Sequence, residues 1–158
     1  MHRSLLARAF GILALLVTTL SLGTATTGVA SASTTASCSH AGCRGLDPQA
    51  SGCSSGAYTL DSFTAHWGSY VELRFSPDCG AYWTRITPAR NNRDYTAWTQ
   101  ASSDSSYYET RVSGNCWYNG TGVPCDAVWT PMTTNALVRS CHSSDAYECT
   151  DWHVTSMG

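Results

Sequence analysis

The chain has 158 residues, of which 42% are hydrophobic and 13% charged, and its formal net charge at pH 7 is −2. It contains no lysine, which excludes lysine nucleophiles and Schiff bases, and its arginines form no basic cluster that would indicate a nucleic-acid partner. The informative features are eight cysteines and an excess of tryptophan and tyrosine over phenylalanine.

Residues 1–32 have the pattern of a secretory signal peptide. The segment starts with Arg3, Arg8 and no acid, and it ends in small residues at Ala30-Ser31-Ala32. Its apolar run of about 14 residues is shorter than the ~20 that a membrane-spanning helix needs. We therefore expect cleavage near Ala32, export, and no membrane association after cleavage.

The rest of the chain predicts one domain made of short strands. Residues 33–37 look like a flexible leader, and residues 38–158 are long enough for a single disulfide-rich β domain. After a glycine- and serine-rich loop, short β-branched or aromatic runs alternate with turn residues, and no helical periodicity occurs. The runs cover residues 57–63, 70–76, 81–87, 94–100, 106–113, 125–132, 135–141 and 147–154.

Alternating polarity within these runs is typical of half-buried strands. In residues 70–76, Val71 and Leu73 point one way and Glu72 the other. A short turn follows, so this run and the next should form a hairpin. We predict an all-β fold, a compact disulfide-stapled barrel or sandwich of about seven to eight short antiparallel strands.

The cysteines predict a disulfide framework, because their number is even and all of them follow the signal segment. Zinc would need closely spaced ligand pairs such as C-x2-C, which the sequence lacks, so we expect no metal and no other cofactor. Exchange among the first four cysteines is an open alternative to the favoured pairs. These pairs are Cys38–Cys43, Cys53–Cys79, Cys116–Cys125 and Cys141–Cys149.

The segment Cys43–Cys53, CRGLDPQASGC, surrounds a single acid, Asp47. An aspartate before proline commonly opens a turn by accepting hydrogen bonds from backbone N–H groups two or three residues later. Gly45 and Gly52 allow backbone angles that other residues resist. A calcium site would need several oxygen ligands close together. We therefore interpret Asp47 as a clamp for the chain.

Residues 116–125 contain Asn119-Gly120-Thr121. Asn-Gly suits a type I′ turn, which would place the two flanking cysteines opposite one another. The same three residues match the N-glycosylation acceptor pattern, but the turn interpretation is favoured.

Three blocks, CSHAGCRGLDPQASGC, VELRFSPDCGAYWTRI and LVRSCHSSDAYECTDW, resemble the YjfA-like family of small secreted bacterial domains of unknown function. The resemblance covers most of residues 38–154 and is densest over 43–53 and 72–83. The segment NCWYNGTGVPC looks like an addition to the family pattern. The resemblance implies export, disulfides and a β fold, and it supplies no catalytic residue.

No catalytic residue is predicted. The serines show no G-x-S-x-G elbow, and His66 and His142 fall in predicted loops, where histidines are most often surface groups. A glycan hydrolase would need a carboxylate pair, for which Glu72 with Glu109 or Asp61 are the candidates.

Two arginines close to Glu72 favour a simpler interpretation of this acid. Arg74 lies on the same predicted strand as Glu72 and Arg85 on the next one, and this arrangement is typical of a solvated, salt-bridged strand face.

Tryptophan and tyrosine combine a flat apolar face with a polar edge and are enriched at contact surfaces. Four tryptophans in predicted strands, Trp83, Trp98, Trp129 and Trp152, should mainly fill the core. The aromatic residues in or beside predicted loops are the candidate ligand-binding residues: Trp67, Trp117, Tyr118, Tyr107 and Tyr108.

Together these features predict a secreted, non-catalytic β module, either extracellular or associated with the cell wall. Its expected partner is a cell-wall or other extracellular polysaccharide, or an extracellular protein. The alternatives are an extracellular glycan hydrolase and a secreted inhibitor or toxin.

Overall fold

A computed structural model describes residues 35–155, apart from 90–92, 104–105, 117–124 and 135–136. All described residues belong to one compact unit, Ala32–Gly158. Among them, no helix has the length and apolar character needed to cross a membrane. The predicted Asn119-Gly120-Thr121 turn lies outside the described residues.

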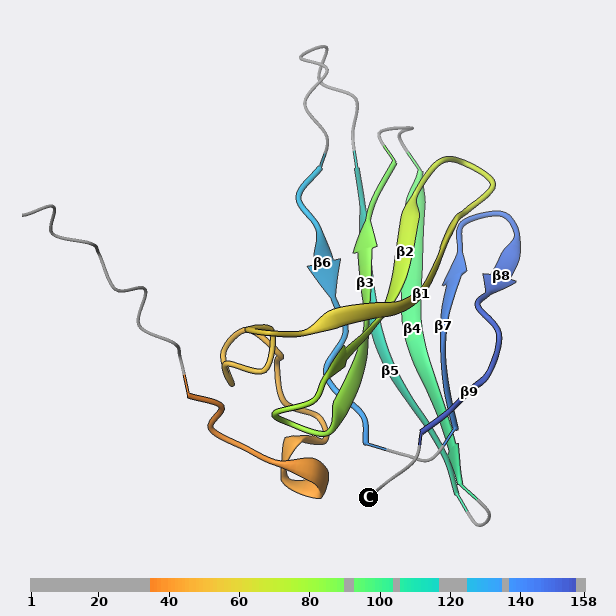
Figure 1. Cartoon of the computed structure of the whole chain (residues 1–158). Helices are drawn as coiled ribbons and strands as arrows, with labels where there is room; N and C mark the ends of the chain where they lie inside the picture. The colour runs from red at the N-terminus through yellow and green to blue at the C-terminus, as the bar shows by residue number, and fades with distance from the viewer. Residues whose placement is uncertain (1–34, 90–92, 104–105, 117–124, 135–136, 156–158) are drawn as a thin grey trace, which may run out of the picture. The chain divides into compact units, whose positions relative to one another are not determined.

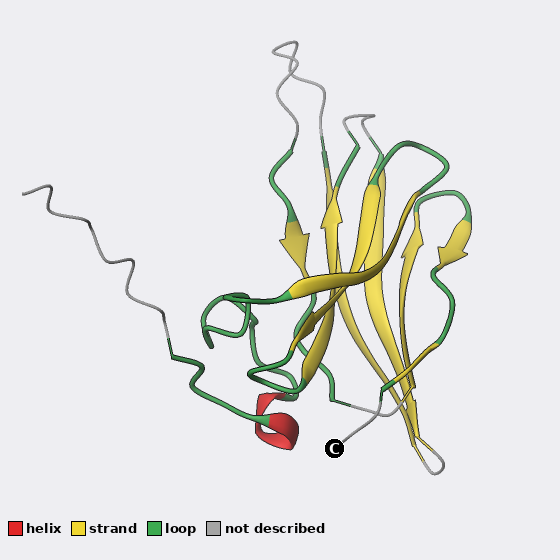
Figure 2. Cartoon of the chain, viewed as in Figure 1, coloured by secondary structure: helices red, strands yellow, loops and turns green. Residues whose placement is uncertain are grey.

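The unit is built from nine strands in two antiparallel sheets (Figures 1 and 2). The first sheet has the order β1-β2-β3-β6, and the second has the order β5-β4-β7-β8 with β9 also paired to β7. In the described part of the chain, one 3-10 turn, η1 (His40–Cys43), precedes the strands. The strands are β1 (Tyr58–Thr64), β2 (Tyr70–Ser76), β3 (Ala81–Thr87), β4 (Asp94–Ser103), β5 (Ser106–Asn115), β6 (Val128–Trp129), β7 (Leu137–Ser143), β8 (Tyr147–Cys149) and β9 (His153–Val154).

The all-β prediction is confirmed. Because no strand among the described residues closes the two sheets into a barrel, they form a sandwich. The hairpin predicted for residues 70–76 and 81–87 is present as the antiparallel strands β2 and β3. The last predicted run is divided into two strands by Thr150. Its hydroxyl accepts the Ser140 N–H at 3.0 Å and its own N–H donates to the Ser140 carbonyl at 2.9 Å. The hydrogen bond from the Ser140 N–H to the Thr150 hydroxyl replaces a backbone hydrogen bond to β7, and so it interrupts the strand pairing at Thr150.

The core lies between the sheets, where β2 and β3 face β4 and β7. Val71, Leu73, Ile86 and Val138 are completely buried there. The alternation predicted for β2 is therefore correct. In β1 a bulge between Thr59 and Asp61 shifts the pairing with β2.

A hydroxyl network runs through the centre of this core. The Thr99 Oγ1 atom lies 2.9 Å from the hydroxyls of both Thr84 and Thr130, and Thr84 Oγ1 donates to Ser140 Oγ at 2.7 Å. Ser140 in turn donates to the Glu72 carbonyl at 3.2 Å. Because each hydroxyl has a partner, the buried polar groups join the two sheets without a large desolvation cost.

Four disulfides are present, Cys38–Cys43, Cys53–Cys79, Cys116–Cys125 and Cys141–Cys149, the same pairs that the sequence favoured. The first two fix the loop before β1. The last joins cysteines that face each other across β7 and β8.

Within the first loop, Asp47 is the expected clamp. Its Oδ1 atom accepts the N–H groups of Gln49 and Ala50, both at 2.8 Å. Gly45 and Gly52 have φ angles of 80° and 78°, in the left-handed region that favours glycine. The Asp47 Oδ2 atom also accepts the indole N–H of Trp129 at 2.9 Å. This contact ties the loop to the first sheet, and the sequence alone did not indicate it.

Candidate functional site

The predicted ligand-binding aromatics are not gathered at one place. Trp67 lies in the β1–β2 loop beneath the Arg93 guanidinium, 4.1 Å from its ring centroid. Tyr107 and Tyr108 are neighbours on β5, so their side chains point to opposite faces of the second sheet. Trp117 and Tyr118 lie outside the described residues. Of the five, Tyr107 belongs to a larger aromatic cluster.

The outer face of the second sheet carries this cluster, because strand register aligns its members. Glu109 on β5 pairs with Gln100 on β4, which pairs with Arg139 on β7. Side chains of directly paired residues share one face of a sheet. We call the cluster the aromatic face; it consists of Trp98, Gln100, Tyr107, Glu109, Arg111, Arg139, Tyr147 and Trp152.

Three aromatic side chains of the aromatic face are open to solvent. Tyr107 and Tyr147 are each 58% exposed, and Trp152 is 40% exposed. Trp98 is almost covered: its ring lies 5.4 Å from that of Tyr147, and the Arg111 guanidinium lies 4.7 Å above it. The exposed Tyr147 ring thus packs against the buried ring of Trp98.

Gln100 links the aromatic face through hydrogen bonds. Its amide nitrogen donates to Glu109 at 3.0 Å and to the Tyr147 hydroxyl at 3.1 Å. Its amide oxygen accepts the Arg139 Nε–H at 2.6 Å. The Arg139 guanidinium lies 4.4 Å from the Trp152 ring centroid. Gln100 is buried, so these bonds hold the rings around it in defined positions.

Glu109 accepts hydrogen bonds from Tyr107 and Arg111 as well as from Gln100. Desolvation acts to raise the pKa of Glu109, but these three bonds outweigh it and the pKa lies below its ordinary value. Desolvation and the hydrogen bond to Glu109 raise the pKa of Tyr107 to about 12. Near neutral pH, Tyr107 therefore stays protonated and Glu109 ionised.

The four tryptophans expected in the core do not lie between the two sheets. Trp83 is buried, but on the outer side of the first sheet against the first loop, where Trp129 packs beside it. Trp98 is on the outer face of the second sheet, and Trp152 is 40% exposed. Trp98 shares β4 with Ala97, which faces inward, so alternation sends its indole outward. Trp152 follows the interruption at Thr150. Tyr147 was missed because no periodicity signals an aromatic residue at the start of a three-residue strand.

The carboxylates proposed for a hydrolase are not brought together. Glu72 lies on the outer side of the first sheet and Glu109 on the outer side of the second. Asp61 is engaged by the His153 ring at 2.9 Å. The salt bridges of Glu72 to Arg74 and Arg85 are present, both at 3.5 Å, but Glu72 is only 6% exposed. The expectation of a solvated strand face is therefore wrong at Glu72, because the two arginines and Thr59 cover it.

The predicted loop positions of the histidines are right for His66 and wrong for His142. His142 lies inside β7 and is 1% exposed. Both of its ring nitrogens lack a hydrogen-bond partner among the described residues. Burial lowers its pKa, partly opposed by the negative charge of Glu148.

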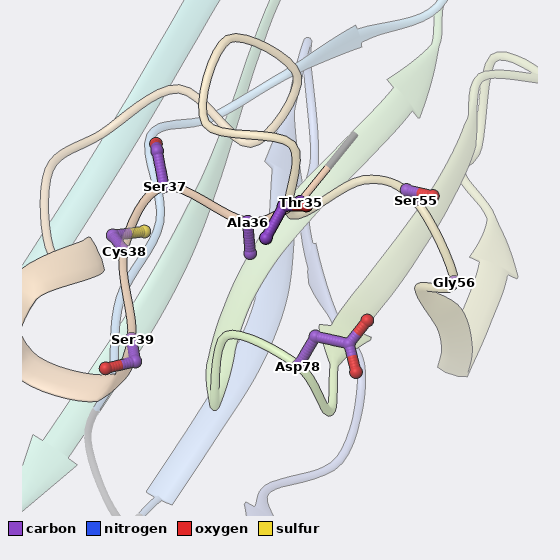
Figure 3. A pocket seen from close by; sticks show the side chains of 8 residues that line it. All are labelled: Thr35, Ala36, Ser37, Cys38, Ser39, Ser55, Gly56 and Asp78. Carbon is purple, nitrogen blue, oxygen red and sulfur yellow. The ribbon is translucent and has the colours of Figure 1, made fainter. Parts of the chain in front are cut away.

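Two further features, a hollow beside the first loop and a group of four cysteines, offer few groups for catalysis or metal binding. A hollow of about 620 Å³ beside the first loop is lined mostly by small side chains, and Asp78 is the charged one (Figure 3). The sulfurs of Cys38, Cys43, Cys53 and Cys79 lie within 4.8 Å of one another. They are joined as two disulfides and so are not available as thiolate ligands.

A family model for a protein of unknown function (DUF2690) matches residues 41–147, more than half of the chain. The chain belongs to the DUF2690 family. No curated protein and no solved structure matches it. The matched part of this DUF2690 protein contains the Asp47 loop and most of the aromatic face, whereas Trp152 follows it. The finer resemblance to YjfA-like proteins stays a prediction.

Proposed function

We propose that this DUF2690 protein is an exported, non-catalytic module that binds extracellular or cell-wall polysaccharide through the aromatic face. The observation that carries the proposal is the set of three exposed aromatic side chains, Tyr107, Tyr147 and Trp152, on the outer face of the second sheet. Hydrogen bonds hold the two tyrosines, and the Arg139 guanidinium packs against Trp152.

The chemistry of this surface suits a sugar chain. Aromatic rings pack against the apolar C–H faces of sugars, while amide, carboxylate and guanidinium groups exchange hydrogen bonds with hydroxyls. The rings are already positioned, so little conformational entropy is lost on binding. Arg111 and Arg139 exceed Glu109 by one positive charge, which suits a neutral or weakly acidic polymer better than a strongly basic partner.

Export is supported by two features. The sequence begins with the signal-peptide pattern, and the structure contains four disulfides, which persist in oxidising compartments. Location outside the cytoplasm would give the aromatic face access to envelope glycans.

The test is retention of the oxidised protein on purified peptidoglycan and on insoluble polysaccharides. Tyr107→Ala and Tyr147→Ala should each reduce retention about tenfold, because loss of a ring contact costs roughly 1 to 3 kcal/mol. Retention of the wild type should change little between about pH 5 and 9, since Tyr107 and Glu109 keep their charge states over this range.

Tyr70→Ala is the matched control. Tyr70 is 42% exposed on the first sheet, away from the aromatic face, and its replacement should leave retention unchanged. If no polysaccharide retains the wild type, or if Tyr70→Ala weakens retention as much as Tyr107→Ala does, the glycan proposal is wrong. A protein partner would then be the better explanation.

A further inference from the structure

The outer side of the first sheet carries a second surface, which we call the arginine groove. It has a volume of about 490 Å³, within the range of small-ligand sites, and lies on the opposite sheet from the aromatic face. The lining residues that matter here are Gln49, Arg74, Trp83, Arg85, Asp126 and Trp129.

The walls of the arginine groove are held in place from several directions. Gln49 belongs to the Asp47 loop, which the first two disulfides fix. The Asp47 carboxylate accepts a hydrogen bond from the indole N–H of Trp129 at 2.9 Å. Trp129 on β6 is in turn the strand partner of Arg85 on β3. Trp83 lies on the same outer face and is buried against the disulfide-linked Cys53 and Cys79. The groove is therefore preorganised rather than formed by surface side chains alone.

The two arginines in the groove differ in their partners. The terminal nitrogens of Arg74 donate to the Thr59 hydroxyl and to the Ala57 carbonyl, both at 2.7 Å. Arg85 forms its salt bridge to Glu72 through its Nε atom, at 3.5 Å. In the described part of the chain, neither terminal nitrogen of Arg85 has a protein partner. Its side chain is 42% exposed and lines the groove.

We propose that the arginine groove binds a sugar that carries a carboxylate, such as a uronic acid. The carboxylate accepts two hydrogen bonds from the terminal nitrogens of Arg85, the geometry that a guanidinium fork favours. The sugar ring packs against the Trp129 indole, and Gln49 and Asp126 exchange hydrogen bonds with its hydroxyls.

Other charges in the groove narrow the ligand class. Glu72 is already neutralised by Arg74 and Arg85, and it accepts the Thr59 hydroxyl at 2.8 Å. Asp126 adds a negative charge to the lining. The positive charges of Arg74 and Arg85 are thus balanced by Glu72 and Asp126, so there is no excess positive charge to hold a dianion, and a monocarboxylate is favoured over a phosphate monoester.

The test is calorimetric or NMR titration of the oxidised protein with methyl glucuronide, its uncharged methyl ester, and inorganic phosphate. The acid should bind at least about tenfold more tightly than the ester, because the ester cannot form the charge-assisted pair at Arg85. It should also bind at least about tenfold more tightly than phosphate, which lacks the sugar ring that packs against Trp129. Arg85→Gln should remove this preference, and Arg85→Lys should restore part of it.

Arg93→Gln is the matched control. The Arg93 side chain is 41% exposed, pairs with Asp145, and lies outside both surfaces. Its replacement should leave the titration unchanged. Equal binding of acid and ester, a preference for phosphate, or no binding of the acid at about 10 mM would overturn the proposal. Retention by the aromatic face is independent of this outcome, since Tyr107→Ala should not affect the titration.

Discussion

At the scale of single residues, Asp47 shows how one side chain can have structural and positioning roles together. One carboxylate oxygen accepts two backbone N–H groups and so holds the turn, while the other accepts the Trp129 indole N–H. Desolvation acts to raise the pKa of Asp47, but the hydrogen bonds to Ala50, Trp129 and Gln49 outweigh it and lower the pKa. The clamp predicted from Asp-Pro is thus also a support for the arginine groove.

Asp47→Asn should destabilise the fold by roughly 1 to 2 kcal/mol, because an amide has one acceptor oxygen where three N–H donors now converge. The folded-state pKa of Asp47 lies below its ordinary value of 3.8. Its contribution is therefore present at neutral pH and is lost as the pH falls through the folded-state pKa. Urea unfolding at several pH values should show the difference between wild type and variant shrinking in acid. A constant difference would contradict this account.

At the scale of elements, β7 places a histidine where a hydrophobic residue would be expected. His142 is buried between the sheets with both ring nitrogens unpartnered among the described residues, and Glu148 on β8 is the neighbouring charge. Neutral His142 can be accommodated there, but the imidazolium would have to be desolvated.

Stability should therefore fall in mild acid through His142. Its folded-state pKa is lowered from 6.5, so below that pH the unfolded chain takes up a proton that the folded chain does not. The loss is at most about 1.4 kcal/mol per pH unit. His142→Met should lose less stability than wild type when the pH is lowered from about 8 to 5. Parallel pH profiles in chemical denaturation would show that His142 is not responsible.

At the scale of the whole molecule, the disulfides attach the first loop, which belongs to neither sheet, to the sandwich. Cys53–Cys79 joins the first loop to the β2–β3 turn across 26 residues, whereas Cys141–Cys149 spans 8 residues between strands that are already paired. The longer bridge restricts the unfolded chain more strongly.

Replacing both Cys53 and Cys79 by serine should cost about 3.5 kcal/mol, and the corresponding change at Cys141 and Cys149 about 2.6 kcal/mol, by the chain-entropy relation. Denaturation midpoints at equal slope would measure the two losses. The first change should also weaken carboxylate binding, since it releases a wall of the arginine groove. A larger loss at the shorter bridge would contradict the loop-length argument.

Much of the architecture could be predicted from local patterns. Period-2 alternation identified β2 and its hairpin partner β3, and cysteine spacing favoured the four pairs that are present, because these features depend on neighbours in the chain. The bulge in β1 and the interruption at Thr150 were not predictable, because each depends on a partner strand.

The sequence by itself determined the strand-rich fold and the turn at Asp47. It favoured the four disulfide pairs but left exchange among the first four cysteines open. Only the tertiary structure decided which aromatic residues face solvent together. It also decided that the terminal nitrogens of Arg85 make no hydrogen bond to another described residue. Tyr107, Tyr147 and Trp152 come from separate segments, and they share one face through the register of β4 with β5 and β7, the pairing of β7 with β8, and the contact of Trp152 with Arg139. The physical reason is that side-chain direction follows from strand alternation, whereas proximity across a sheet depends on register, which long-range pairing sets.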